Sequence, residues 1–195
     1  MSTHLISALL DKNMIKLGQF TLKSGKVSPI YINLREMIAY PKLLTQIADT
    51  IYAQKPEGFK PDLICGVPYS ALTLMAHLSI QHNLPMILKR KEAKAYGTKQ
   101  LLEGIFSPGM NCVVIEDVVT TGQSTIETIN ELRAAGLVVT EVLVLIDREQ
   151  GAKESFAKAH VNYHAAFTLK EILDEMVKIG RINATERQEI AQQLN

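Results

Sequence analysis

The stretch C-V-V-I-E-D-V-V-T-T-G-Q-S-T, residues 112–125, decides the fold. Its first four residues are apolar on both alternating faces, which is typical of a strand in a parallel sheet that helices cover on both sides. The acidic pair Glu116-Asp117 comes next, and small hydroxyl residues, one glycine and an amphipathic segment follow it. The stretch therefore predicts a strand, a loop and the start of a helix. Ligands of open α/β sheets bind at junctions of this kind.

The loop over residues 120–125 has the composition of an anion site. Its backbone N–H groups and hydroxyls are expected to converge on one anion, and the positive end of the following helix favours a phosphate there. Glu116 and Asp117 stand just before the loop, where carboxylates can accept hydrogen bonds from sugar hydroxyls or hold a hydrated Mg²⁺. We interpret this combination as a site for a sugar phosphate. In the plainer alternative, the acidic pair merely ends a strand and Thr121-Gly122 turns the chain.

Length and composition bound the class of protein. With 195 residues, 47% of them hydrophobic, the chain is long enough for one domain with a full core. A net charge of +1 gives no overall attraction to nucleic acid or membrane, so neither is expected as a partner. Cys65 and Cys112 lie in apolar strand candidates and are predicted to be buried thiols. The start of the chain lacks a basic region and no apolar run approaches about 18 residues, so we expect a soluble, cytoplasmic protein.

The acidic pair, the two apolar residues after it and T-T-G resemble the motif with which type I phosphoribosyltransferases bind 5-phosphoribosyl 1-pyrophosphate (PRPP). The glycine-rich alternatives G-x-x-x-x-G-K-[ST] and G-x-G-x-x-G follow no strand candidate. The resemblance implies that Asp117 and Glu116 contact the ribose hydroxyls and, through water, the Mg²⁺ that PRPP carries. No direct metal ligand is expected. PRPP contacts, chiefly to the 5′-phosphate, are further implied for Thr120, Thr121, Gly122, Gln123, Ser124 and Thr125.

The segment F-T-L-K-S-G-K-V-S-P-I-Y-I, residues 20–32, predicts a hairpin around a Ser-Gly-Lys turn. A solvated turn lysine is the ordinary interpretation of Lys23. However, F-x-L-K-S-G followed by S-P-x-Y resembles the amino-terminal segment of the orotate phosphoribosyltransferases, which implies that Lys23 reaches the ligand and that Tyr31 and Ile32 line an orotate pocket. Before the hairpin, apolar residues at helical spacing predict a helix over residues 4–17 that Gly18 ends.

Residues 61–70, P-D-L-I-C-G-V-P-Y-S, predict a strand that leads into a tight loop before a buried helix. Backbone N–H groups of such a loop suit a diphosphate, although an ordinary connection explains the residues equally well. The loop resembles the pyrophosphate loop of the family, which often has lysine where this chain has Ser70. The resemblance implies that Tyr69 and Ser70 face PRPP, while the role of Ser70 stays open.

The run K-R-K-E-A-K-A-Y-G-T-K, residues 89–99, has five cations and one acid and lacks a helical apolar stripe. Such a run is ordinarily a solvated face, but it also suits a mobile loop that closes over a pyrophosphate. R-K-x-x-K-x-[HY]-G resembles the catalytic loop of the orotate phosphoribosyltransferases, which serves the partner subunit of a homodimer. Many bacterial members have histidine where this chain has Tyr96. The sequence Tyr-Gly-Thr-Lys here resembles the form of the enzyme that is fused to orotidylate decarboxylase. PRPP contacts are implied for Arg90, Lys91, Lys94 and Tyr96, with Lys94 and Asp117 as the catalytic residues.

A buried strand candidate ends in D-R-E-Q-G, residues 147–151. Charged residues after a strand are commonly just solvated, yet these lie at the sheet edge where ligands enter. D-R-x-x-G is also a feature of the orotate phosphoribosyltransferases. It implies that Arg148 binds the orotate carboxylate, a planar anion suited to a guanidinium fork. The resemblance further implies that Thr120 contacts orotate.

These patterns predict an α/β fold, a doubly wound and mostly parallel five-stranded sheet with helices on both faces, as in type I phosphoribosyltransferases. We expect a single domain over residues 1–195, with an amino-terminal hood over about 1–40, a core over about 41–175 and a C-terminal helical tail over about 176–195. The strand candidates lie near residues 62–65, 86–89, 112–116, 142–146 and 163–167.

The implied activity is transfer of the phosphoribosyl group from Mg²⁺-PRPP to orotate, which gives orotidine 5′-monophosphate and pyrophosphate in UMP biosynthesis. Two alternatives remain open. Another PRPP-dependent base phosphoribosyltransferase would share the PRPP motif but should lack the basic loop and the L-K-S-G hood. A non-catalytic regulator that senses PRPP or nucleotides and binds nucleic acid would need a basic face or a helix-turn-helix extension.

Overall fold

The computed structural model describes residues 2–21, 25, 27–90 and 101–194. Within these ranges, the central sheet has six strands in the order β5-β4-β3-β6-β7-β8. Neighbouring strands run parallel except for β4 and β5, so the mostly parallel sheet predicted from the sequence is confirmed. The strands are β3 (Leu63–Gly66), β4 (Met86–Lys89), β5 (Leu102–Glu103), β6 (Cys112–Val119), β7 (Glu141–Asp147) and β8 (Asn162–Thr168).

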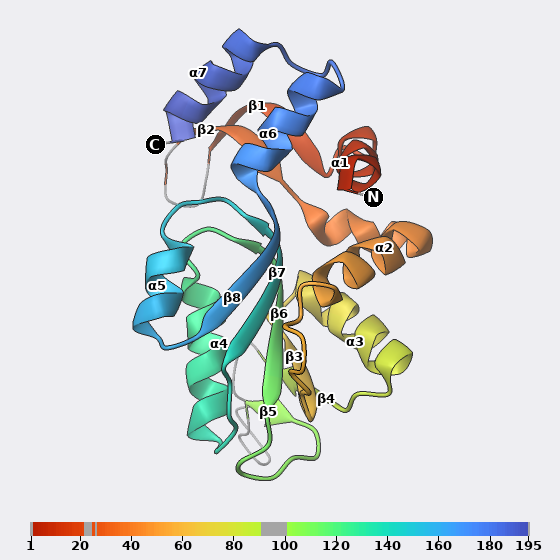
Figure 1. The fold of residues 1–195 in the computed structure, drawn as a ribbon, viewed down its shortest axis with the longest axis vertical. Helices are drawn as coiled ribbons and strands as arrows, with labels where there is room; N and C mark the ends of the chain where they lie inside the picture. Colours follow the sequence, from red (N-terminus) through yellow and green to blue (C-terminus); the bar gives the residue numbers. More distant parts are fainter. Residues whose placement is uncertain (1, 22–24, 26, 91–100, 195) are drawn as a thin grey trace.

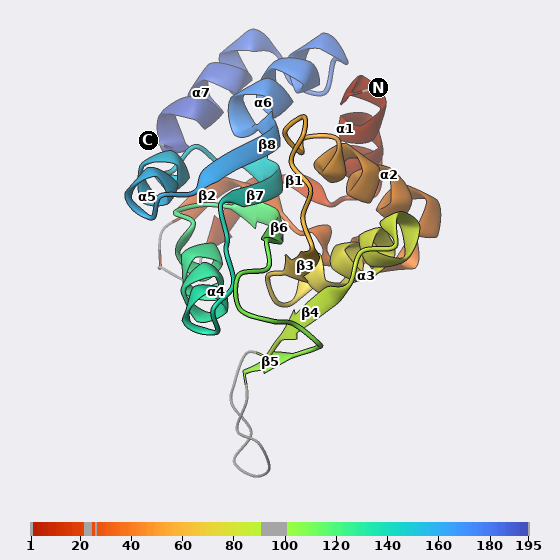
Figure 2. The same cartoon turned by 60° about the horizontal axis from the view of Figure 1, so that its bottom comes forward.

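The strand that the sequence did not predict is β5. It has two residues and pairs antiparallel with the end of β4, Leu88 opposite Glu103 and Lys89 opposite Leu102. Figure 2 shows β4 and β5 at the edge of the sheet away from β8. Two residues are too few for an alternating pattern to stand out, which explains why five strands were expected.

Helices cover both faces of the sheet (Figure 1). Each face has its own apolar cluster: Ile64 of β3 belongs to the cluster under α2 and α3, and the next residue, Cys65, belongs to the cluster under α4 and α5. This alternation along one strand is what a sheet buried on both faces requires. The covering helices are α2 (Pro41–Tyr52) and α3 (Ser70–His82) on one face, and α4 (Gln123–Ala134) and α5 (Ala152–Lys158) on the other.

A hood lies at one end of the molecule, and both ends of the chain contribute to it (Figure 1). Its hairpin pairs Thr21 with Val27 in antiparallel register, which confirms the hairpin predicted around the Ser-Gly-Lys turn. The last helix packs against β2 and α6, so the C-terminal tail is part of the hood. The elements are α1 (Ser2–Asp11), β1 (Ile15–Thr21), β2 (Val27–Ile32), the 3-10 helix η1 (Leu34–Ala39), α6 (Leu169–Lys178) and α7 (Ala184–Leu194).

The helix predicted over residues 4–17 is wrong beyond Asp11. Asn13 has a φ of 55°, and the Met14 N–H donates to the Leu9 carbonyl (2.8 Å), which closes the end of α1. Met14 is buried, whereas Leu17, which has the same apolar spacing, is 39% exposed, and strand β1 already begins at Ile15. Asparagine tolerates the left-handed conformation, and this local turn overrides an apolar spacing that suits either element.

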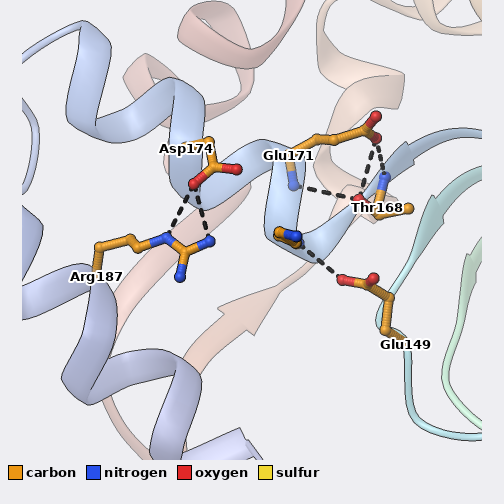
Figure 3. A network of polar contacts seen from close by, with 6 residues as sticks. Glu149, Thr168, Glu171, Asp174 and Arg187 are labelled. Carbon is orange, nitrogen blue, oxygen red and sulfur yellow. Dashed lines mark hydrogen bonds and ion pairs between the residues drawn. The ribbon is translucent and has the colours of Figure 1, made fainter.

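The start of α6 is closed by a capping box. Glu171 N–H donates to Thr168 Oγ1 (3.2 Å), and Thr168 N–H donates to Glu171 Oε2 (2.7 Å), as Figure 3 shows. This reciprocal pair satisfies two N–H groups that a helix start leaves without partners.

Both cysteines are free and buried, as predicted. Burial raises the pKa of both thiols, that of Cys65 to about 12, so neither is a reactive thiolate at neutral pH.

Within the described part of the chain, none of the helices has the length and apolar character to cross a membrane. The cytoplasmic location stays a prediction.

Candidate active site

The acidic pair lies at the carboxyl end of β6, next to the loop that follows β3. Glu116 is 7% exposed; its Oε2 accepts a hydrogen bond from Thr125 Oγ1 (2.9 Å) and its Oε1 from the Asp117 N–H (3.2 Å). Asp117 is half-buried, and its Oδ2 accepts a hydrogen bond from Ser70 Oγ (2.6 Å). Ser70 is the first residue of α3. Parallel pairing of β3 with β6 therefore brings two predicted PRPP-binding segments together.

Burial raises the pKa of the Glu116 carboxyl well above its usual value, and the adjacent charge of Asp117 raises it further. The folded, ligand-free site thus favours a protonated Glu116. A cation bound beside the pair would reverse that preference, because an opposite charge favours the ionised form. The acidic pair is therefore held in an environment that gains from a positively charged ligand.

The shift of Glu116 predicts how stability depends on pH. Because the pKa is higher in the folded protein than in the unfolded chain, ionised Glu116 destabilises the fold, and the free energy of unfolding should decline as pH rises above the ordinary glutamate pKa of about 4.3. Glu116→Gln keeps an oxygen for the Asp117 N–H and removes the charge. We expect the variant to unfold at a higher temperature than the wild type at pH 8, with the gap closing toward pH 4.

The control for this prediction is Glu57→Gln, because Glu57 is exposed in a loop. That change should leave stability nearly unaltered at both pH values. A Glu116→Gln protein that is less stable than the wild type at pH 8 in thermal melts would contradict the assignment of a buried, destabilising charge.

The loop between β6 and α4 turns at Gly122, which is the N-cap residue of α4. Gly122 has a φ of 77°, and a Cβ there would lie 3.1 Å from the Phe156 ring, so glycine fits both the conformation and the space. Helical hydrogen bonding begins with Ile126 N–H to the Gly122 carbonyl (2.9 Å), which leaves the preceding N–H groups of the first turn for a ligand. Thr125 is buried with its hydroxyl on Glu116, so it contributes to the acidic pair rather than offering a free hydroxyl.

Arg148 lies just after β7 and is 9% exposed. Its N–H donates to the Val119 carbonyl (3.0 Å), and its guanidinium donates to Ser28 Oγ of the hood (3.2 Å). Its Nε atom is buried and has no hydrogen-bond partner among the described residues. Burial lowers the pKa of this guanidinium. A buried cation with spare donor capacity is costly on its own, so its surroundings fit an incoming anion.

One cavity of about 300 Å³ connects these features. The hood closes one side with Tyr31, whose ring stacks on that of Phe20 at 5.3 Å between centroids. Eight of the residues predicted from the sequence line it: Tyr31, Ile32, Tyr69, Ser70, Glu116, Asp117, Thr120 and Arg148.

Other predicted site residues lie elsewhere. Residues 121–125 continue directly from Thr120 but do not line this cavity. Arg90 follows β4 and donates from Nε to Glu103 Oε1 (2.6 Å), where it forms an ion pair. Lys23, Lys91, Lys94 and Tyr96 fall outside the described residues.

Sequence reasoning assigned no role to some residues that the structure places here. Ser28, in the S-P-x-Y segment, is 2% exposed and fixes the Arg148 guanidinium. Its sequence signal was a serine among apolar residues on the buried side of a strand, which calls for a polar partner. The cavity is also lined by Asn33, Leu34, Arg35, Pro68 and Val118.

Among the described residues, no group of three or more His, Cys, Asp or Glu side chains is arranged to hold a metal ion.

The fold and the site together define a class of protein. It is an α/β protein in which an acidic pair and a buried arginine line one cavity at the strand ends, next to a loop suited to an anion. The sequence profile of the phosphoribosyl transferase domain matches residues 33–176, which is most of the chain.

The most informative relatives narrow the class. The chain is 42% identical to the Bos taurus uridine 5′-monophosphate synthase over 92% of its length, but it spans only 38% of that protein. It is 39% identical to an orotate phosphoribosyltransferase of Caenorhabditis elegans, with 96% of this chain and 83% of that protein covered. The crystal structure of orotate phosphoribosyltransferase from Aeropyrum pernix superposes with a TM-score of 0.80 at 31% identity, covering 92% of this chain and 99% of that one. The chain therefore belongs to the phosphoribosyltransferase family, in the branch of the orotate phosphoribosyltransferases.

Proposed function

We propose that this chain transfers the phosphoribosyl group of PRPP to orotate, giving orotidine 5′-monophosphate and pyrophosphate in UMP biosynthesis. The observation that supports this best is the buried Arg148 guanidinium, which lines the same cavity as the acidic pair. A base with a carboxylate supplies the anion that this cation lacks, whereas a purine or uracil does not. The names of the relatives agree with this choice of base.

The ribose and its metal are assigned to the acidic pair. Asp117 accepts hydrogen bonds from ribose hydroxyls, and Glu116 and Asp117 contact the water shell of Mg²⁺. Two adjacent carboxylates in a site that gains from positive charge suit a hydrated divalent cation. Bound Mg²⁺ neutralises part of the negative charge of the pyrophosphate. Ser70 holds Asp117 in place through its hydroxyl, which gives a role to the serine that replaces the lysine of other members.

The base lies between the hood and the end of β7. Arg148 binds the orotate carboxylate, Tyr31 and Ile32 line the pocket from β2, and Thr120 contacts the ring from the opposite loop. Lys23 reaches the ligand from the hairpin turn. The 5′-phosphate is held by residues 121–125 at the start of α4, where N–H groups and the helix dipole favour an anion.

The reaction breaks the bond between C1′ and the pyrophosphate oxygen, and N1 of orotate forms the new bond from the opposite face. The electron pair of the broken bond leaves with pyrophosphate, so positive charge develops on the ribosyl group and negative charge on the leaving group. Asp117 stabilises the positive charge on the ribosyl group. The cations of the loop over residues 89–99 stabilise the negative charge on pyrophosphate, and Lys94 follows this leaving group. Tyr69, Arg90, Lys91 and Tyr96 complete the pyrophosphate site. Arg90 would exchange its ion pair with Glu103 for the pyrophosphate.

We further propose a homodimer in which the loop over residues 89–99 serves the site of the partner subunit. Apolar side chains are exposed on α3 and on two elements that contact it, η1 and β4: Ile80 of α3 is 85% exposed, Ile38 of η1 62% and Met86 of β4 44%. Exposed apolar side chains gathered on adjoining elements are typical of protein interfaces. A second copy covering them would bring the base of the loop, which follows β4, near the interface.

Mixing two inactive variants tests the shared site. In a mixed dimer of Lys94→Ala and Asp117→Asn chains, one site combines an intact loop from the second chain with an intact acidic pair from the first. If subunits pair at random, about a quarter of all sites should recover activity. Exchange is verified by mass spectrometry of differently tagged chains, and no recovery after proven exchange would mean that each loop serves its own subunit.

The activity itself is tested by incubating the protein with orotate, Mg²⁺ and PRPP and following orotate absorbance. We expect a decrease that requires both PRPP and Mg²⁺ and that pyrophosphate reverses. A protein that binds PRPP but leaves orotate unchanged under these conditions would fit a PRPP sensor instead.

A further inference from the structure

Tyr163, on β8, lies between the loop assigned to the phosphate and the turn that presents Arg148. Its hydroxyl donates to Asp147 Oδ2 (2.8 Å), and its ring packs on that of Phe156 at 5.2 Å between centroids. The Phe156 ring in turn lies against Gly122. Tyr163 therefore touches the supports of both loops and neither ligand subsite directly.

Asp147 shapes the turn that contains Arg148. It is 3% exposed, and its Oδ1 accepts the N–H of Glu149 (2.8 Å), two residues further on. Glu149 has a φ of 57°, a left-handed conformation that a nonglycine residue adopts only when its neighbours hold it there. The Asp147 carboxylate thus fixes the backbone on both sides of Arg148.

The far side of the turn is anchored to α6. Glu149 Oε2 accepts the N–H of Lys170 (2.9 Å) in the first turn of that helix, as Figure 3 shows. The Arg148 N–H is bound to the end of β6. Contacts from β6, β8 and α6 therefore converge on three successive residues, and the central residue is the buried arginine.

Among the described residues, the Asp147 carboxylate accepts hydrogen bonds from the Glu149 N–H and from the Tyr163 hydroxyl. A buried carboxylate that loses a donor carries an uncompensated desolvation cost and tends to move toward another donor or water. Burial and the bond to Asp147 raise the pKa of Tyr163 to about 12, so its hydroxyl remains a donor throughout the neutral range. Loss of the hydroxyl should loosen the turn without removing any group that touches a ligand.

We propose that Tyr163 is a positioning residue for base recognition: through Asp147 it holds Arg148 in the orientation that binds the carboxylate of the base. This rests on the proposed function. It adds a residue of β8, outside the cavity, to the determinants of base specificity.

The test uses Tyr163→Phe, which keeps the ring on Phe156 and deletes only the hydroxyl. Calorimetry compares two ligands that differ by the carboxylate, orotidine 5′-monophosphate and UMP. We expect the dissociation constant for orotidine 5′-monophosphate to rise about three- to tenfold, the range spanned by one lost hydrogen bond, while that for UMP stays within about twofold. KM for orotate should rise by the same factor, and KM for PRPP should not change.

Tyr52→Phe is the matched control, because Tyr52 stacks on His82 far along the chain from the site and offers the same loss of a hydroxyl. It should alter neither dissociation constant. Equal weakening of both nucleotides by Tyr163→Phe, or no weakening of either, would overturn the positioning role. A wild-type protein that binds neither nucleotide would instead overturn the proposed function itself.

Discussion

Replacing Arg148 with methionine is expected to lower kcat/KM for orotate by about 30-fold or more. The guanidinium is buried and its Nε has no partner among the described residues, so the orotate carboxylate in the variant would lose a partner that is largely removed from water. Removing one member of a buried, hydrogen-bonded charge pair costs about 2–5 kcal/mol, which corresponds to roughly 30-fold to several thousand-fold. Methionine is similar in length and leaves little empty space.

The same substitution should not destabilise the ligand-free protein. Burial lowers the pKa of Arg148, so the charge costs free energy until an anion binds, and methionine removes that cost. We expect a melting temperature equal to or above that of the wild type. Arg148→Lys, which keeps the charge but loses the planar fork, should be intermediate in activity. Unchanged orotate kinetics in Arg148→Met, measured with steady-state assays, would remove Arg148 from the base site.

Asp117→Asn should lower kcat by at least about tenfold, or about 1.4 kcal/mol of transition-state stabilisation. The side chain keeps its shape and an oxygen that can accept the Ser70 hydroxyl. It loses the charge to which we assign stabilisation of the ribosyl cation. Glu116→Gln should have a smaller effect if Glu116 only orders water around the metal. KM for PRPP separates binding from chemistry, since a loss in kcat with little change in KM indicates an interaction made mainly in the transition state.

Asp49→Asn is the matched control for this change. Asp49 is an exposed carboxylate on α2 that accepts a hydrogen bond from Gln81 (2.8 Å), outside the cavity. It should leave kcat unchanged, and both variants should melt cooperatively. Wild-type turnover in Asp117→Asn would rule out the role proposed for the acidic pair.

The central strands could be predicted because they are short apolar runs that end in chemically distinctive loops. The run from Cys112 and the run from Val142 are buried on both faces of the sheet, so their continuous apolar composition is enough to predict strands. The end of α1 could not be predicted in the same way. One residue, Asn13, turns the chain, while the apolar spacing around it is compatible with either helix or strand.

The site also has a part that the sequence predicts and a part that only the folded structure reveals. Glu116, Asp117 and Thr120 stand on one continuous motif, so sequence reasoning found them together. Contacts between distant segments could not be predicted from the sequence. Ser28 and Arg148 are 120 residues apart, and only the folded hood brings them within hydrogen-bond distance. Tyr163 had no motif at all. In the register of β7 and β8, Tyr163 lies opposite Val142 and Asp147 opposite Thr168, so only the side-chain hydrogen bond joins Tyr163 to Asp147.

The most direct test of the account is a competition among bases. The protein is incubated with PRPP, Mg²⁺ and equal concentrations of orotate, uracil, hypoxanthine, guanine and adenine, and mass spectrometry identifies the nucleotides formed. A cavity that pairs a buried arginine with the base should select the one base with a carboxylate, because the others leave that cation unpaired. We expect orotidine 5′-monophosphate as the dominant product, and its formation should be at least about tenfold slower in Asp117→Asn. Comparable amounts of UMP, or purine nucleotides in preference to orotidine 5′-monophosphate, would contradict the assignment of orotate as the substrate.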